Sequence, residues 1–350
     1  MPDWDDLRKL LDDGVRAGVA PAMVFLAWAQ GRPRALMAAG QATTETIFDL
    51  ASLTKPLATA PLCLDMQARG RLPWSEPLGE LLGSAVPADK AGITIERLLT
   101  HSAGYPAYQP YYQALEREAP LKRRGLLLAM LMNEPLAHEP GAKALYSDLG
   151  YLLLGLILER AGRQPLDQAV NQIYTALGVE GPRYLPLGGQ TPPLEDIAPC
   201  GPLPGRPVVH GQVEDENAFS LGGLAGQAGL FGTATQVAAV MDALCRAAQD
   251  QGPWPVEEAV RLFAVDQTTP GSSRTPGFDT PSGSGSQAGP NAPSGVVGHL
   301  GFTGVSVWWR PAVNRGLVLL TNRVAHGRAN DKIKEFRRLV HQMAWPLLGS

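Results

Sequence analysis

Two apolar hairpin-like segments near opposite ends of the chain constrain its fold most. The segment MVFLAWAQGRPRALMAAGQ, residues 23–41, predicts two strands joined by a turn. The segment GVSVWWRPAVNRGLVLLTNR, residues 304–323, repeats the pattern. Helices are expected beside them, over residues 3–18 and about 330–345. The simplest assembly is one antiparallel sheet, built from both ends of the chain and flanked by the terminal helices.

The middle of the chain has helical periodicity. Leucine and alanine recur at helical spacing over residues 52–69, 94–100, 121–132, 148–161, 165–176, 233–250 and 255–264. We therefore expect an α/β (α+β) fold in which residues 1–60 and 290–350 form a discontinuous sheet subdomain, with a mostly helical subdomain, 61–265, inserted. Residues 266–296 are rich in Pro, Gly and Ser and are expected to form a long irregular loop.

Composition narrows the classes of function. A chain with 45% hydrophobic and 18% charged residues is typical of a globular protein, and a net charge of -3 gives no reason to expect a nucleic-acid partner. The cysteines lack metal-ligand spacing, so neither a metal nor a cofactor is expected. The N-terminus lacks the basic region of a signal peptide, and no apolar run is long enough to span a bilayer. A cytoplasmic protein is therefore expected, or a periplasmic or secreted one if a leader has been removed, and its oligomeric state stays open.

Ser52 and Lys55, in IFDLASLTKPLATA, are the first candidates for chemistry. The sequence after them predicts a helix with Ser52 in its first turn, and helical residues three apart share a face. A hydroxyl within reach of an amine is what a nucleophile and its base require. The spacing alone is weak evidence, since about 0.3 such pairs arise by chance in a chain of this composition. A capping serine beside a solvated lysine is the alternative.

Two later segments place further polar groups at the ends of predicted elements. Tyr146 and Asp148 stand between a loop and a strongly apolar helix, where a tyrosine hydroxyl can project into a cleft. The alternative is a core tyrosine with Asp148 as the helix N-cap. His299 and Gly301 open a strand in VVGHLGFTG, where glycine allows close approach of another backbone or a ligand.

Together these segments resemble the serine β-lactamase and penicillin-binding-protein superfamily. Its marks are Ser-x-x-Lys, a Tyr- or Ser-led triplet and a Lys/His-x-Gly strand. The order and spacing here are similar to those of class C β-lactamases, their D-alanyl-D-alanine carboxypeptidase relatives and related carboxylesterases. ITIERLLTHSAGYP and SLGGLAGQAGLFGTA also look like this family, so the resemblance covers about residues 10–345. It implies a class C β-lactamase-like fold and a serine hydrolase that works through an acyl-enzyme.

The resemblance also implies roles for individual residues. Ser52 would be the acylating nucleophile, and either Lys55 or Tyr146 would remove its proton. Burial and a nearby cation would lower the pKa of Lys55, but the choice between the two bases stays open. The amides of Ser52 and Phe302 would stabilise the oxyanion, and Gly301 would leave room for substrate.

Three departures from the family pattern bear on the substrate. His299 and Leu300 stand where β-lactamases commonly have lysine and a hydroxyl residue, and Asp148 stands where the family often has asparagine. Each change weakens the attraction for a carboxylate. We therefore expect an esterase or amidase acting on small neutral acyl substrates, with weak or absent β-lactamase activity. A D,D-carboxypeptidase or penicillin-binding protein stays open, as does a non-catalytic module that binds a peptide or a cell-wall fragment.

Other polar residues are given structural interpretations. His101 and Ser102 are expected to be loop scaffolding, because neighbours in sequence need not face each other. The acidic run 214–217 is interpreted as a solvated or capping turn, since no histidine supports a metal site there. Tyr108 and its neighbouring tyrosines either line the pocket or lie on the surface.

Overall fold

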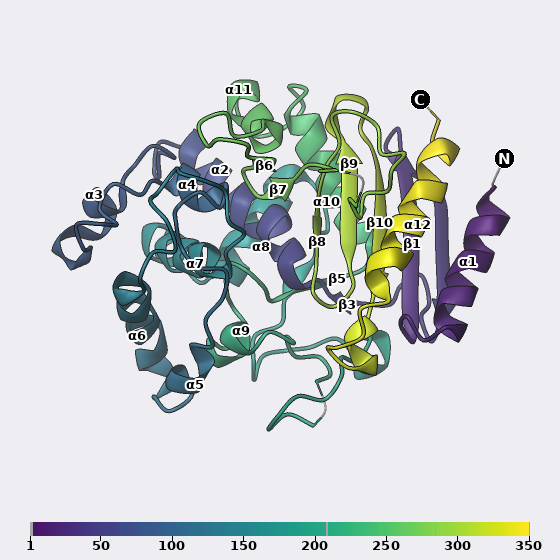
Figure 1. Ribbon diagram of the computed structural model, residues 1–350, viewed down its shortest axis with the longest axis horizontal. Coiled ribbons are helices and arrows are strands. Elements are labelled where there is room, and N and C mark those ends of the chain that lie inside the picture. Colours follow the sequence, from purple (N-terminus) through teal and green to yellow (C-terminus); the bar gives the residue numbers. More distant parts are fainter. Residues whose placement is uncertain (1–2, 208, 284, 350) are drawn as a thin grey trace.

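An antiparallel sheet that joins both ends of the sequence is the centre of the fold (Figure 1). The computed structural model describes residues 3–207, 209–283 and 285–349. Its strands are β1 (Ala22–Ala29), β2 (Arg32–Gly40), β3 (Phe48–Asp49), β4 (Arg183–Tyr184), β5 (Leu230–Gly232), β6 (Arg274–Thr275), β7 (Phe278–Asp279), β8 (Val297–Leu300), β9 (Ser306–Arg310) and β10 (Arg315–Thr321). Within the described residues, seven of them form the main sheet in the order β2-β1-β10-β9-β8-β7-β6.

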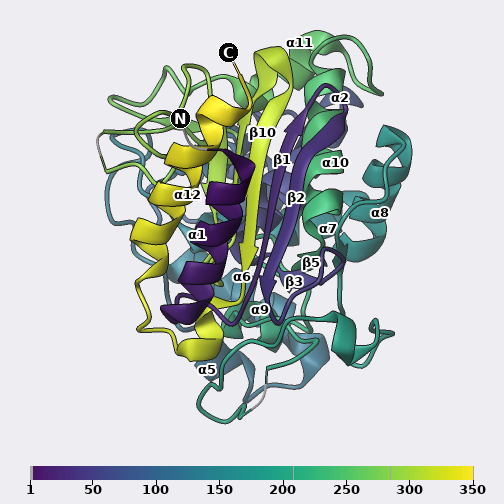
Figure 2. The same cartoon turned by 90° about the vertical axis from the view of Figure 1, so that its right-hand side faces the viewer.

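Helices cover both faces of this sheet. The helices of the described residues, some of which lie away from the sheet, are α1 (Trp4–Arg16), α2 (Ala60–Ala68), α3 (Leu78–Leu82), α4 (Ile95–Leu99), α5 (Tyr112–Leu115), α6 (Pro120–Asn133), α7 (Asp148–Gly162), α8 (Leu166–Leu177), α9 (Glu216–Ser220), α10 (Ala234–Ala247), α11 (Val256–Ala259) and α12 (Ile333–Leu347). Figure 2 shows α1 and α12 side by side on one face, while α10 lies against the other. None of the helices in the described ranges is long and apolar enough to cross a membrane.

The interior strand β1 accounts for the continuous apolar run near the N-terminus. It pairs with β2 on one side and β10 on the other. Val24 and Leu26 belong to the core on the α10 side, whereas Met23 and Phe25 belong to the core under α1 and α12. Because side chains alternate between faces and both faces are buried, no position of β1 can be polar.

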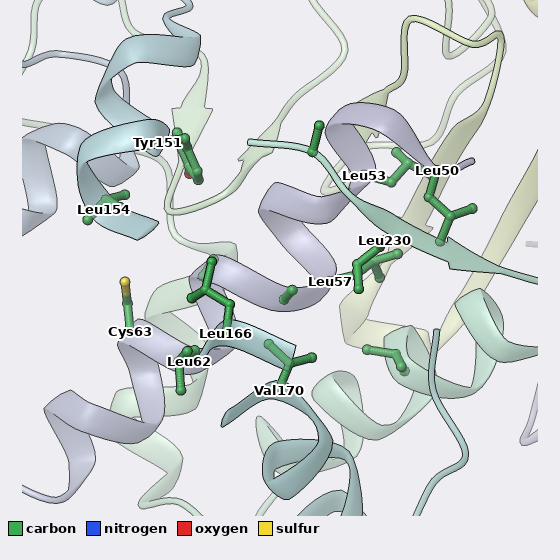
Figure 3. Close-up of a cluster of buried hydrophobic side chains, with 14 of the residues drawn as sticks. Leu50, Leu53, Leu57, Leu62, Cys63, Tyr151, Leu154, Leu166, Val170 and Leu230 are labelled. Atoms are coloured by element: carbon green, nitrogen blue, oxygen red, sulfur yellow. The ribbon is translucent and has the colours of Figure 1, made fainter. Parts of the chain in front are cut away.

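The inserted helices form the larger core, of which Figure 3 shows a part. Leu57 and Leu62, which follow Ser52 in the chain, lie in this core with Leu166 and Val170 of α8. The segment that carries the candidate nucleophile is therefore anchored by its apolar side.

The sequence-based prediction agrees with most long elements and differs from the structure at two places that matter for the site. Ser52 lies in a 3-10 turn, Ala51–Leu53, followed by a π-helical turn, Lys55–Thr59, and the regular helix begins only at Ala60. The expected irregular loop contains the β6–β7 hairpin, which extends the sheet beyond β8. The division into a sheet subdomain and a helical subdomain stays a prediction.

Two glycines let α7 pack directly on the loop before β5. A Cβ added to Gly226 would lie 2.1 Å from the Tyr151 carbonyl oxygen and 2.9 Å from the Gly155 nitrogen. The Gly226 carbonyl oxygen also accepts a hydrogen bond of 2.6 Å from Thr59 Oγ1, in the turn that follows Ser52. Backbone contact at Gly226 thus joins α7, this loop and the Ser52 segment.

We expect Gly226→Ala to lower the free energy of unfolding by about 1–3 kcal/mol, because the added methyl group meets backbone atoms that cannot move independently. Urea denaturation followed by circular dichroism measures the change. Gly125→Ala is the control, since Gly125 is exposed in α6 with nothing within 4 Å of its added Cβ, and alanine is the better helix former. Equal stability of the two variants would contradict the tight contact at Gly226.

Candidate active site

The turn that carries Ser52 is held in an unusual backbone conformation beside a cavity of about 540 Å³. Ala51 has φ 46°, in the left-handed region that alanine rarely adopts. Asp49 supports this turn, because its Oδ1 accepts the Ala51 N–H at 2.8 Å and its Oδ2 accepts the Glu214 N–H at 2.7 Å. The buried carboxylate of Asp49 thus fixes the strained residue Ala51, which immediately precedes Ser52.

Three side chains from two distant segments meet at Ser52. Lys55 Nζ donates a hydrogen bond of 3.0 Å to Ser52 Oγ. The Tyr146 hydroxyl donates one of 2.9 Å to the same oxygen. The structure therefore brings together the alcohol, amine and phenol that the sequence singles out, with the Tyr146 ring 5.7 Å from the ring of His299.

Lys55 is a buried ammonium. Besides Ser52 Oγ, its Nζ donates to Asp148 Oδ1 at 2.8 Å and to the Gln227 carbonyl oxygen at 3.1 Å, so three donors have three acceptors. Burial alone would lower the pKa of Lys55, but the charge of Asp148 and the interactions with Tyr146 raise it above its ordinary value. The expected lowering of this pKa is wrong, because the nearest charge is an anion.

Tyr146 is a phenol in the resting protein. Burial raises its pKa, and the favourable charge of Lys55 only partly opposes this. His101 supports the tyrosine from behind, with ring centroids 4.6 Å apart, and its Nδ1 accepts the Ser147 N–H at 3.1 Å. This matches the scaffolding interpretation of His101.

Asp148 begins α7 and does not cap it. The N-cap is Ser147, whose Oγ accepts the Gly150 N–H at 3.3 Å, so the N-cap interpretation of Asp148 is wrong. A carboxylate in the first helical turn is favoured by the helix dipole. From this position Asp148 reaches Lys55 and also lines the cavity beside Ser52.

His299 is neutral and lines the cavity. Its Nδ1 lies 2.8 Å from the Leu300 carbonyl oxygen, which can only accept, so Nδ1 carries the proton. Burial, together with the charges of Lys55 and Arg274, holds the pKa of His299 well below its ordinary value. Its Nε2 is buried, bears the lone pair and has no partner within the described residues. A lone pair repels a carboxylate, as the sequence-based argument about His299 requires.

The backbone at Ser52 and Phe302 offers free donors. Neither amide donates a hydrogen bond within the part of the chain that the structure describes, and both residues line the cavity. Gly301 allows the close approach of another backbone, one of the two reasons expected. A Cβ there would lie 2.3 Å from Val305 Cγ2 and 2.9 Å from the Leu50 carbonyl oxygen, so glycine lets the strand end approach the Ser52 turn, and the residue also lines the cavity.

Sequence reasoning missed Arg274. It lies on β6, lines the cavity with Ser52, and places its guanidinium carbon 5.5 Å from the centre of the Tyr146 ring. Asp279 on β7 orients it through an ion pair of 3.2 Å. The available signal was that Arg274 is the only Arg or Lys between Arg261 and Arg310.

The acidic run 214–217 is a capping turn, one of the two interpretations expected from the sequence, and not a solvated one: Asp215 is the N-cap of α9, and its Oδ1 accepts the Ala218 N–H at 2.7 Å. Glu214 and Asn217 are buried, and Glu214, Asp215 and Glu216 line a second cavity of about 370 Å³ that also contains Ser52. Tyr108 lines this cavity too, although its side chain is 44% exposed. The sequence therefore indicated the capping role but not the cavity, because adjacent acidic residues usually mark a surface.

Comparisons with known proteins show which family and fold this chain shares. The family model described as Beta-lactamase matches residues 7–342. A relative from Escherichia coli O157:H7, provisionally named D-alanyl-D-alanine carboxypeptidase, is 32% identical over an alignment of 321 residues that covers 81% of this chain and 70% of the relative.

Two solved structures share the fold. EstCE1, described as a hydrolase with promiscuous acyltransferase activity, has a TM-score of 0.72 at 21% identity, covering 96% of this chain and 97% of that one. A class C β-lactamase from Rhodobacter sphaeroides has a TM-score of 0.71 at 16% identity, covering 97% of this chain and 99% of that one. The expected class C β-lactamase-like fold is confirmed.

We expect Asp148→Asn to lower the pKa of Lys55. Burial disfavours the charged ammonium, and the variant lacks the Asp148 carboxylate that opposes this effect. Nuclear magnetic resonance of protein with isotope-labelled lysine measures the titration, and Lys55→Met assigns the signal. Lys143→Met serves as a control for the loss of a lysine elsewhere, since Lys143 is exposed. An unchanged titration of Lys55 in the Asp148 variant would show that the ion pair does not set its charge.

Proposed function

Because this chain belongs to the β-lactamase family, we propose that it is a serine hydrolase in which Ser52 forms an acyl-enzyme with a small ester or amide. The observation that carries the proposal is the pair of hydrogen bonds to Ser52 Oγ, 3.0 Å from Lys55 and 2.9 Å from Tyr146, at the wall of a cavity. Such contacts are what an activated nucleophile needs.

Tyr146 is the better candidate for the base. Lys55 is charged and uses its three donors, so it has no lone pair to accept a proton. Its Nζ lies 5.0 Å from the centre of the Tyr146 ring, where a positive charge stabilises the phenolate. In the reactive form, Ser52 gives its proton to the Tyr146 phenolate while Oγ bonds to the carbonyl carbon.

The remaining steps use the same groups. The amides of Ser52 and Phe302 donate to the oxyanion of the tetrahedral intermediate. As the bond to the leaving group breaks, the Tyr146 phenol donates the proton it received. Water then attacks the acyl-enzyme, giving its proton to Tyr146 and returning Ser52 as an alcohol when the acid departs.

The substrate is proposed to be an ester or amide without a carboxylate at the His299 position. His299 presents a lone pair and Leu300 an isobutyl group, and both line the cavity that contains Ser52. Neither group stabilises an anion, so weak or absent turnover of β-lactams follows.

Arg274 favours a second candidate, a D,D-carboxypeptidase. Its guanidinium lies in the same cavity, where it can pair with the terminal carboxylate of a peptide. The name of the Escherichia coli relative agrees with this alternative.

We expect a fluorophosphonate probe to label the wild-type protein and not Ser52→Ala. Tyr146→Phe should slow labelling by about 10²–10⁴-fold, the usual contribution of a general base. The wild-type rate should rise with pH above neutrality, because the phenolate fraction grows as pH approaches the raised pKa of Tyr146. Intact-protein mass spectrometry measures labelling, and Tyr112→Phe is the control. A wild-type protein that stays unlabelled would instead support the non-catalytic binding module.

Arg274→Ala separates the two candidates. For an esterase, hydrolysis of p-nitrophenyl acetate by wild type should exceed release of D-alanine from an N-acylated D-alanyl-D-alanine peptide, and Arg274→Ala should change the ratio of the two rates little. For a D,D-carboxypeptidase the peptide is preferred, and the variant should lose at least tenfold in kcat/KM on the peptide relative to the ester. A chromogenic cephalosporin completes the panel, and its efficient hydrolysis would contradict the argument from His299 and Leu300.

A further inference from the structure

The second cavity, like the first, is lined by Ser52, but most of its other lining residues differ. The two cavities share Ser52, Asp148, Phe302 and Arg328. Tyr146 lines the first and not the second. Because Tyr146 is the group that protonates the leaving group, the leaving group must lie in the first cavity. The second cavity is then available for the acyl group.

Carboxylates dominate this second cavity. Its lining contains one guanidinium, Arg328, and the carboxylates of Asp49, Asp148, Glu214, Asp215 and Glu216. Arg328 is occupied, with ion pairs of 2.6 Å to Glu214 and 2.7 Å to Glu216. Lys55, which lies behind the wall, is occupied by Asp148 at 2.8 Å. The acidic groups therefore outnumber the cations that the chain supplies.

Asp215, like Asp49, is a carboxylate of this cavity without a cation, and it lies beside Gln227. Its Oδ1 accepts the Ala218 N–H at 2.7 Å and Gln227 Nε2 at 3.1 Å. In the described ranges it forms no ion pair. Burial, with Asp148 nearby, raises the pKa of Asp215 to about 7, as expected for a carboxylate that lacks a positive partner.

Gln227 provides an independent sign of a missing donor. Gln227 is 1% exposed and lines the second cavity. Its Oε1 is buried without a hydrogen-bond partner in the described part of the chain. A buried acceptor left unpaired costs about 1–3 kcal/mol, so a ligand that donates to it is favoured. A protonated amine donates up to three hydrogen bonds and carries the charge that Asp215 lacks.

We propose that the second cavity binds a protonated amine on the acyl group, so that the preferred substrates are aminoacyl esters or amides. Asp215 supplies the countercharge and Gln227 Oε1 accepts one of the ammonium hydrogens. This inference rests on the proposed acyl transfer to Ser52 and specifies its substrate class. The amine takes no part in bond making, and the same ester or amide bond is broken.

Matched pairs of substrates test the amine subsite. Alanyl p-nitroanilide, as both enantiomers, is compared with isobutyryl p-nitroanilide, which has a methyl group in place of the ammonium. 6-Aminohexanoyl p-nitroanilide is compared with the heptanoyl compound, so that an amine farther from the carbonyl is also sampled. We expect wild type to prefer the charged member of at least one pair by tenfold or more in kcat/KM.

Asp215→Asn should reduce that preference at least tenfold, since it removes the charge while keeping an oxygen acceptor. Gln227→Met, which removes the Oε1 acceptor, should also reduce it and provides a second variant if Asp215→Asn folds poorly. Asp196→Asn, which removes an exposed carboxylate that does not line the cavity, is the control and should keep the preference. Thermal unfolding and fluorophosphonate labelling of Ser52 verify that each variant is folded.

Each result separates the two proposals. Preference for the uncharged member of both pairs, or a charged preference that Asp215→Asn and Gln227→Met leave intact, overturns the amine subsite while labelling of Ser52 still supports the hydrolase. Absence of turnover together with absence of Ser52 labelling overturns the hydrolase, and the amine subsite with it.

Discussion

The buried ammonium of Lys55 is the constraint on which the site depends. It is held by Asp148 at the start of α7, by the Gln227 carbonyl before β5, and by Ser52 in its own turn. Removing an ammonium from water costs several kcal/mol, which only well-placed partners recover. Displacing one of these partners would leave the charge of Lys55 uncompensated. The hydrogen bonds of Lys55 therefore also favour the packing of α7 against the loop at Gly226.

Much of the fold can be predicted from sequence because local pattern and burial agree. The apolar runs of β1 and β10 indicate strands covered on both faces, and they are. The meeting of Ser52, Lys55 and Tyr146 follows from the family resemblance. The charge state of Lys55 could not be predicted, since Asp148 stands 93 positions away and becomes its nearest charge only after folding.

The two residues on which the substrate proposals rest, Arg274 and Asp215, were not recognised from sequence for a similar reason. Arg274 stands in a stretch rich in Pro, Gly and Ser, and only the short β6–β7 pairing places it at the sheet edge beside Ser52. From sequence alone, Asp215 is interpreted as part of a solvated or capping turn, and only the structure shows that it lines a cavity. Solved structures with the same fold differ in their described activities. Specificity in this chain must therefore be sought in the walls on either side of the serine.

The contact between the Asp49 segment and residues 302–303 also determines when the candidate site can be completed during synthesis. Asp49 and Ser52 emerge from the ribosome early, but the Thr303 hydroxyl that donates to the Asp49 carbonyl, and the Phe302 amide beside Ser52, belong to a strand region made much later. Contacts this distant in sequence form slowly and late. A nascent chain can therefore carry Ser52 through most of translation before the segment with Phe302 and Thr303 completes the wall of its cavity.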